Sequence, residues 1–161
     1  MITAWIDAVQ DMWAGITAPG FDAVNAPYLI KRAEFPASID PSQLALNPLA
    51  LTIPGNVQFE YSAGGQLTGF YQGVTEFHVA PSLDRALIPS LLVWPGLIVT
   101  AAAANIKLGG LVHSFMLDGS DDQILVPVAL QYGNESEHWG FIVRWTCKEV
   151  LNGQFTVGTG E

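Results

Sequence analysis

Three histidines are the residues of this 161-residue chain best suited to chemistry, because a neutral imidazole binds metals and exchanges protons near neutral pH. His78, His113 and His138 each lie on or beside a different candidate strand, so a fold could bring them together. Their spacing does not require a metal, and histidines that face solvent or are satisfied in a core are far more common. We therefore predict no metal site among them.

An acidic loop is the second candidate for chemistry. Asp118, Ser120 and Asp122 alternate like calcium ligands, but the bidentate Glu that ends such a loop is missing. A plain acidic turn is the better interpretation. The chain also has no Gly-x-Ser-x-Gly elbow, no phosphate-binding Gly-x-x-x-x-Gly-Lys loop and no Gly-x-Gly-x-x-Gly motif that opens a helix. We infer no catalytic residues, no cofactor and no enzyme activity.

The composition favours a protein that assembles. Charged residues make up 13% of the chain, against about 25% in ordinary soluble domains, and 50% of the residues are apolar. So little charge predicts that part of the surface is hidden against other chains, most simply copies of itself. A soluble monomer made polar by Ser, Thr, Asn, Gln and Gly is the alternative. The formal net charge of −9 disfavours tight nucleic-acid binding, but it permits an acidic wall past which DNA slides.

The single cysteine and the N-terminus carry weaker information. Cys147 is the only cysteine, so no disulfide can form within the chain, and its alternating apolar surroundings predict a buried, inert thiol. The N-terminus carries Asp7 and Asp11 instead of a basic start followed by an uninterrupted apolar segment. The interpretation is that no secretory signal is present and that the protein is intracellular in origin.

The longest feature of the sequence is the run Ala86–Ile106, which contains no charged residue. Its length is about that of a bilayer span. Pro89, Pro95 and Gly96 argue against one straight helix, and the flanking Arg85 and Lys107 give no charge asymmetry. A bent or two-piece helix packed in a core is favoured. A surface between subunits and a membrane span remain the alternatives.

Periodicity divides the first half of the chain into three parts. Apolar residues at helical spacing predict an amphipathic helix over residues 2–14. Six prolines in residues 19–56 argue against a long helix or a central strand, so this part should run extended, with one short strand around Tyr28–Arg32. Alternating apolar residues over Val57–Tyr61, a Gly-Gly turn and the segment Gly69–Val79 then predict a β-hairpin.

The part of the chain that follows the apolar run is predicted to form strands. Three candidates, Leu111–Leu117, Ile124–Tyr132 and Trp139–Leu151, follow the apolar run and are separated by turn-forming segments. The order helix, hairpin, helix and three-strand meander predicts an α+β fold with a mostly antiparallel sheet, flanked by an N-terminal helix and a central apolar helix. We expect residues 1–151 to form a single domain and residues 152–161 to form a Gly-rich tail.

In their order and spacing these features resemble the tail terminator, or tail-completion, proteins of long-tailed (siphovirus-like) bacteriophages. The resemblance covers about residues 28–150 and no single motif is specific. Its motifs, in sequence order, are Phe35–Ile39 and Leu51–Gly55 before the first long strand, Phe77–Pro81 at the end of the hairpin, Leu108–Gly110 after the apolar helix, and Tyr132–Gly133 with His138–Val143 in a final hairpin. The strongly apolar run Ala86–Ile106 and the tail after Leu151 depart from the pattern.

The resemblance implies a structural virion protein located at the junction of tail and neck and made in the host bacterial cytoplasm. Such a subunit forms a ring, usually a hexamer, that caps the head-proximal end of the tail tube. Its implied partners are further copies of itself, the tail tube protein and a neck or head-completion protein, with double-stranded DNA passing through the ring without tight binding. No membrane is involved.

Two alternatives to that function stay open from the sequence. One is another neck or tail-tube subunit of the same assembly. The other belongs to a different class: a small-ligand-binding or enzymatic α+β domain, with an apolar pocket behind Trp94 and Ala101–Ala104 and with His113 and Asp118 as its only candidate polar pair. For the ring, we expect contacts from the N-terminal helix, the hairpin tip and the acidic loop, through Trp5, Trp13, Gly64, Gly65, Asp118, Asp121 and Asp122.

Overall fold

The computed structural model describes residues 2–16, 28–30, 48–62, 65–81, 88–118, 125, 127–132 and 136–151. Its centre is a six-stranded sheet in which three long strands lie side by side. These are β2 (Leu49–Tyr61), β3 (Leu67–Pro81) and β6 (Ser136–Leu151). Short strands flank them: β1 (Tyr28–Ile30), β4 (Ser114–Leu117) and β5 (Val128–Tyr132). Among the strands of the described residues, only the pairing of β1 with β2 is parallel.

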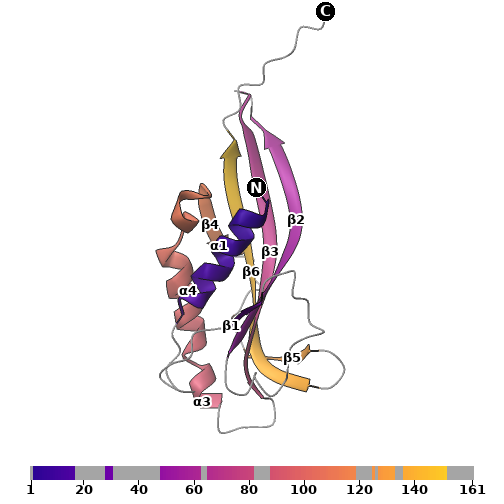
Figure 1. Ribbon diagram of the computed structural model, residues 1–161, viewed down its shortest axis with the longest axis vertical. Coiled ribbons are helices and arrows are strands. Elements are labelled where there is room, and N and C mark those ends of the chain that lie inside the picture. Colours follow the sequence, from indigo (N-terminus) through magenta and orange to yellow (C-terminus); the bar gives the residue numbers. More distant parts are fainter. Residues whose placement is uncertain are drawn as a thin grey trace, which may run out of the picture.

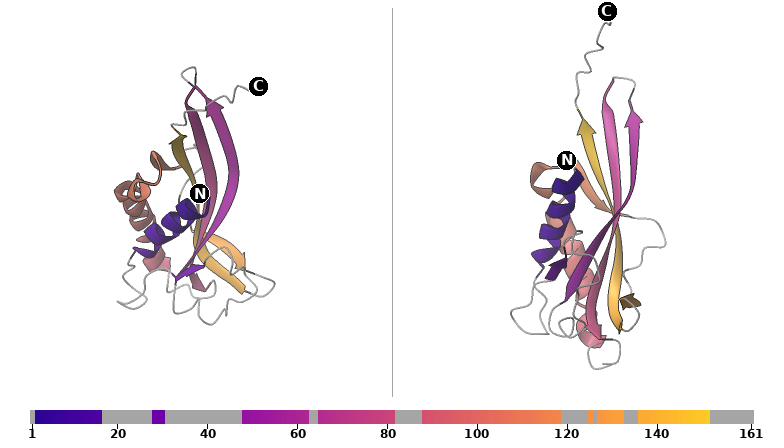
Figure 2. Two further views of the ribbon diagram at one scale, coloured as in Figure 1. Left: turned by 45° about the horizontal axis from the view of Figure 1, so that its top comes forward. Right: turned by 45° about the vertical axis from the view of Figure 1, so that its right-hand side comes forward.

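The helices lie on one side of this sheet, as Figures 1 and 2 show. The first is α1 (Ile2–Ala14), and the apolar run contributes α3 (Ile88–Leu91) and α4 (Trp94–Ala104). The upper part of the β2–β3 hairpin extends past the helices (Figure 1). The predicted α+β class, the N-terminal helix, the hairpin and the two-piece apolar helix are confirmed. None of the helices described here is long and apolar enough to cross a membrane.

The prolines of the apolar run explain why it forms two helices. Pro95 occupies the first turn of α4, where its missing N–H would have no helical partner anyway. Leu92 and Val93 form the turn between the two pieces. After α4, the short 3-10 helix η3 (Leu108–Gly110) carries three successive residues with positive φ, of which Leu108 at 45° is the only non-glycine. This tight turn directs the chain into β4.

The core is an aromatic layer between α1, α4 and the sheet. The centre of the Trp13 ring lies 5.2 Å from that of Phe77, and the Phe77 ring centre lies 6.0 Å from that of Trp94 on α4. Trp5 lies 5.6 Å from Trp145 on β6 in an edge-to-face arrangement. Edge-to-face rings at these distances add to the stabilisation from burial alone. Two large rings on different turns of α1, Trp5 and Trp13, therefore hold this helix against the sheet.

The proline-rich part of the chain holds one correction. The strand β2 begins at Leu49, eight residues before the predicted start at Val57, and it contains Pro54. Only Leu49–Leu51 pair with β1, so Pro54 lies where β2 has β3 on one side alone. The register shifts between Pro54 and Val57. A proline is tolerated at such an edge position and bulge, so the expectation that prolines exclude a central strand fails for the first three residues of β2.

The last three strands are present as predicted but pair differently from a consecutive meander. Both β4 and β5 pair with β6, β4 near its end and β5 near its start. The other side of β6 pairs with β3 along nearly its whole length. A 16-residue strand provides enough edge for two short strands in succession. The edge of β6 after Lys148 has no partner strand in the described part of the chain.

Candidate functional site

The structure does not bring the three histidines together. His78 is buried on β3, with its Nε2 atom 3.4 Å from the Glu76 carboxylate. His113 is exposed just before β4, where its backbone N–H donates to the carbonyl of Lys148. His138 lies opposite Pro81, ten residues before Lys148 on β6, which is about 33 Å along a strand. Among the described residues, no group of three His, Cys, Asp or Glu side chains could hold a metal ion.

The pair His113 and Asp118 does not form a site either. The two residues lie at opposite ends of β4, about 16 Å apart at the rise of an extended strand. The polar pair that the sequence offered to the ligand-binding or enzymatic alternative is therefore not brought together. Trp94, beside which the sequence predicts a pocket, is 1% exposed and packs against Phe77.

The expected interface residues divide into three groups. Trp5 and Trp13 are 5% and 0% exposed within their own chain, so both side chains belong to the core. They are therefore not available for the partner contacts that the sequence predicted. Asp118 and Gly65 are exposed, and Gly65 has a φ of 76° in the hairpin turn. The remaining three, Gly64, Asp121 and Asp122, lie outside the described residues.

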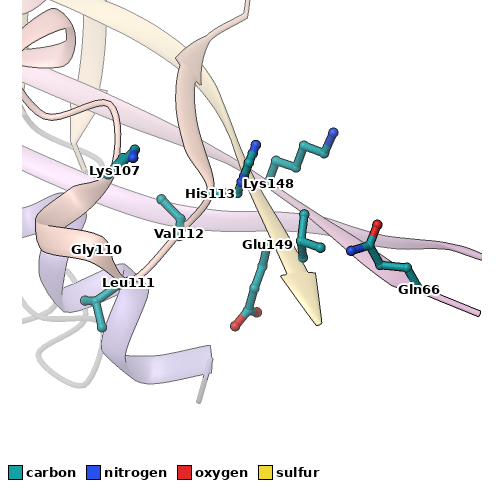
Figure 3. Close-up of a pocket in the computed structure, with 9 residues that line it drawn as sticks. Gln66, Lys107, Gly110, Leu111, Val112, His113, Lys148 and Glu149 are labelled. Atoms are coloured by element: carbon teal, nitrogen blue, oxygen red, sulfur yellow. The ribbon is translucent and has the colours of Figure 1, made fainter. Parts of the chain in front are cut away.

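A cleft of about 720 Å³ opens at the edge of the sheet where β4 stops covering β6. One wall is the segment from η3 to β4, and the other is the end of β6 (Figure 3). The lining residues are Gln66, Lys107, Gly110, Leu111, Val112, His113, Lys148, Glu149 and Val150. This cleft could not be predicted from the sequence, because its walls come from segments about 40 residues apart that only the pairing of β4 with β6 brings together.

The cleft concentrates positive charge in an acidic protein. Two of the six Lys and Arg residues of the chain, Lys107 and Lys148, line it together with His113. The Lys148 ammonium lies 5.8 Å from the centre of the Phe70 ring, which it faces across β3 and β6. Figure 3 shows Lys148 and Glu149 projecting to opposite sides of β6. Lys148 therefore lies on the side of the sheet away from the helices, whereas Lys107 comes from the turn between α4 and η3.

On the helix side of the sheet, a partly buried hydrogen bond holds the cleft residue Glu149. The Tyr71 hydroxyl donates to the Glu149 carboxylate over 2.9 Å. Burial, followed by the hydrogen bond and the negative charge of Glu149, raises the pKa of Tyr71 to about 12. This contact fixes the Glu149 side chain on the helix side, and Lys148 projects from the opposite side of β6.

The projecting hairpin presents a second open edge. In the described residues no strand pairs with β2 beyond Leu51, so its remaining length has β3 on one side only. The exposed fractions of the apolar side chains there rise toward the tip: 41% for Val57, 54% for Phe59 and 73% for Tyr61. A long, apolar, unpaired strand edge is a template for pairing with another strand.

The apolar run and the turns that follow it also leave large side chains uncovered. Five of them, on α4 and in the segments before and after it, are 42–69% exposed. They are Leu92, Val93, Val99, Ile106 and Leu111, of which Val99 lies within α4. Exposed apolar side chains of this size are typical of a protein that packs against a partner.

Comparison with known proteins leaves the family open. No protein-family model matches the chain, and no curated protein shows a significant match to it.

Proposed function

We propose that this chain is a structural subunit that assembles into a ring and acts as a bacteriophage tail terminator. The observation that carries the proposal is the uncovered apolar surface: the open edge of β2 and the exposed apolar side chains on α4 and in the turns around it. In a single chain both surfaces face water, and burying them releases roughly 25 cal/mol per Å² of apolar area. These surfaces lie on different parts of the subunit, which suits head-to-tail contacts that close into a ring.

The α+β fold with a largely antiparallel sheet is the fold that the resemblance implies for a terminator subunit. In this role, six copies would cap the head-proximal end of the tail tube and offer their other face to a neck or head-completion protein. The acidic balance of the chain supports the passage of DNA through the ring, because a negative wall repels phosphates. No cofactor or catalytic residue takes part in the proposed function.

The first test is the native mass of the purified chain by light scattering, with negative-stain imaging of the same peak. We expect a discrete oligomer of about six copies with a central hole, a closed symmetry that head-to-tail contacts can produce. Open filaments would instead indicate a tube subunit of the same assembly. A species that remains monomeric up to about millimolar concentration, and that also fails to bind purified tail tubes, would contradict the proposal.

A further inference from the structure

Two open strand edges lie at the same height on opposite sides of one sheet. Register pairs place Phe59, Glu60 and Tyr61 of β2 level with Gly69, Thr68 and Leu67 of β3. The same three β3 residues are level with Glu149, Val150 and Leu151 of β6. The β2 members of these rows have no described partner on their outer side, and two of the β6 members, Glu149 and Val150, line the cleft.

We propose that the β2 edge of one subunit enters the cleft of the next and pairs with the end of β6, so that the sheet continues from subunit to subunit. This inference rests on the proposed ring. Rotation about a ring axis parallel to the strands keeps every residue at its height, so it brings equal rows of neighbouring subunits together. The strands β2 and β6 both run antiparallel to β3, so the new pairing is parallel, as β1 with β2 already is.

The charges on the two edges are complementary. Glu60 is the only charged residue from Val57 to Gln66, and it is exposed. It shares the row of Thr68 and Val150, so it lies on the same side of the sheet as Lys148, which is two residues from Val150. In the continued sheet, Glu60 of one copy comes beside Val150 and diagonal to Lys148 of the next, within reach of a long side chain.

The apolar side chains match in the same way. Phe59 and Tyr61 lie on the helix side of the sheet, where Phe59 already packs 6.2 Å from the Tyr71 ring. In the neighbouring subunit this side of the cleft is formed by Leu111 and Val112. The aromatic edge would therefore lose its exposure to water against an apolar wall. A second copy is the occupant that the chain itself supplies for the cleft.

The other free edge competes poorly for this contact. The strand β4 has only four residues, and on its outer side the backbone N–H of Phe115 already donates to the carbonyl of Ile106. Short and covered edges are typical protection against unwanted pairing. The edge of β6 inside the cleft remains as the acceptor on this side of the sheet.

A disulfide trap tests the pairing directly. In the double variant Glu60→Cys with Val150→Cys, the two positions within one chain are separated by β3, about 10 Å apart, which is too far for a disulfide. In the proposed pairing, position 60 of one copy and position 150 of the next copy would lie opposite each other on adjacent strands. Oxidation should therefore give a covalent ladder under non-reducing conditions that ends at the subunit number of the ring. The buried Cys147, at 0% exposure, should not contribute to it.

Single variants and the native mass separate the outcomes. Dimers from Glu60→Cys alone would indicate that β2 pairs with β2 of another copy and would overturn the inference. A discrete ring without a ladder would overturn it too, while leaving the proposed function intact. Monomers without a ladder would count against both.

Charge reversal gives an independent measurement. We expect Glu60→Lys and Lys148→Glu each to raise, at least tenfold, the protein concentration at which the oligomer dissociates into monomers. The variant that combines both substitutions should recover most of the lost assembly. Arg144→Glu is the matched control, because Arg144 is exposed on the same strand and the same face but four residues away from Lys148, outside the cleft, where its carbonyl accepts the backbone N–H of Asp118. Loss of assembly in this control as large as in Lys148→Glu, with unchanged melting temperature, would contradict the role of the cleft.

Discussion

At the scale of single residues, glycines within the strands make room for the large rings of the core. Gly73 lies opposite Trp145, and the indole covers the position that a side chain would occupy there. Gly69 accommodates the Tyr71 ring in the same way. In sequence, glycine inside a strand reads as a weak point. Here each glycine is the partner that lets a neighbouring aromatic residue lie flat on the sheet.

Substituting Gly73 by Ala should therefore destabilise the protein strongly. The added Cβ overlaps the Trp145 ring, which is 1% exposed and cannot move away. We expect a loss of about 1–3 kcal/mol in the free energy of unfolding, measured by urea denaturation. The control is Gly96→Ala in α4, where an added Cβ meets nothing within 4 Å and should be neutral or stabilising. Equal effects of the two variants would contradict the packing argument.

The raised pKa of Tyr71 predicts a loss of stability at high pH. Below about pH 10 the phenol is protonated in both the folded and the unfolded chain. Above that value the unfolded chain loses the proton first, because the folded pKa is about 12. The contribution of Tyr71 to stability is therefore complete below pH 10 and is lost as the pH rises through 12. Comparing the pH dependence of unfolding with that of Tyr71→Phe measures it, and identical curves would contradict it.

At the scale of elements, one hydroxyl connects α1, β2, β3 and β6. Thr75 Oγ1 on β3 accepts the indole N–H of Trp13 over 3.1 Å and that of Trp145 over 3.0 Å. Both lone pairs of the hydroxyl are then used, so its own hydrogen is donated to Thr52 Oγ1 on β2, 3.2 Å away. All four residues are buried. This network fixes the position of α1 on the sheet.

Thr75→Val should consequently cost far more than Thr52→Val. The first variant leaves two buried indole N–H groups without an acceptor, at about 1–3 kcal/mol each, whereas the second leaves both indole bonds in place. Valine keeps the β-branched shape in both. We expect the difference to be visible in the melting temperature and in near-ultraviolet circular dichroism of the tryptophans. A loss in Thr52→Val as large as in Thr75→Val would contradict this role of Thr75.

At the scale of the whole molecule, the charge balance predicts weak interaction with DNA. The chain has fifteen Asp and Glu against six Lys and Arg, and two of those cations lie in the cleft that the proposed ring closes. Affinity for DNA comes largely from lysines and arginines that neutralise phosphates. We expect no retardation of a duplex of about 50 base pairs at about 0.15 M salt in a gel-shift assay. A shift that weakens steeply with added salt would contradict this expectation.

The sequence by itself determined the class of fold and the position of most elements. Helical spacing over residues 2–14, alternation after Pro54 and the two prolines of the apolar run each act locally, over one or two turns or a few residues of strand. Local patterns of this kind are readable because each residue's face is fixed by its neighbours in the chain. The low content of charged residues likewise predicts, from composition alone, a surface that packs against partners.

Only the tertiary structure decided which residues share a surface. It placed Trp5 and Trp13 inside the core, separated His113 from Asp118, and paired both β4 and β5 with β6. It also formed the cleft, whose walls are joined by strand pairing between distant segments. The physical reason is that strand partners are chosen by hydrogen bonds and packing across the whole chain, and neither spacing nor composition records that choice.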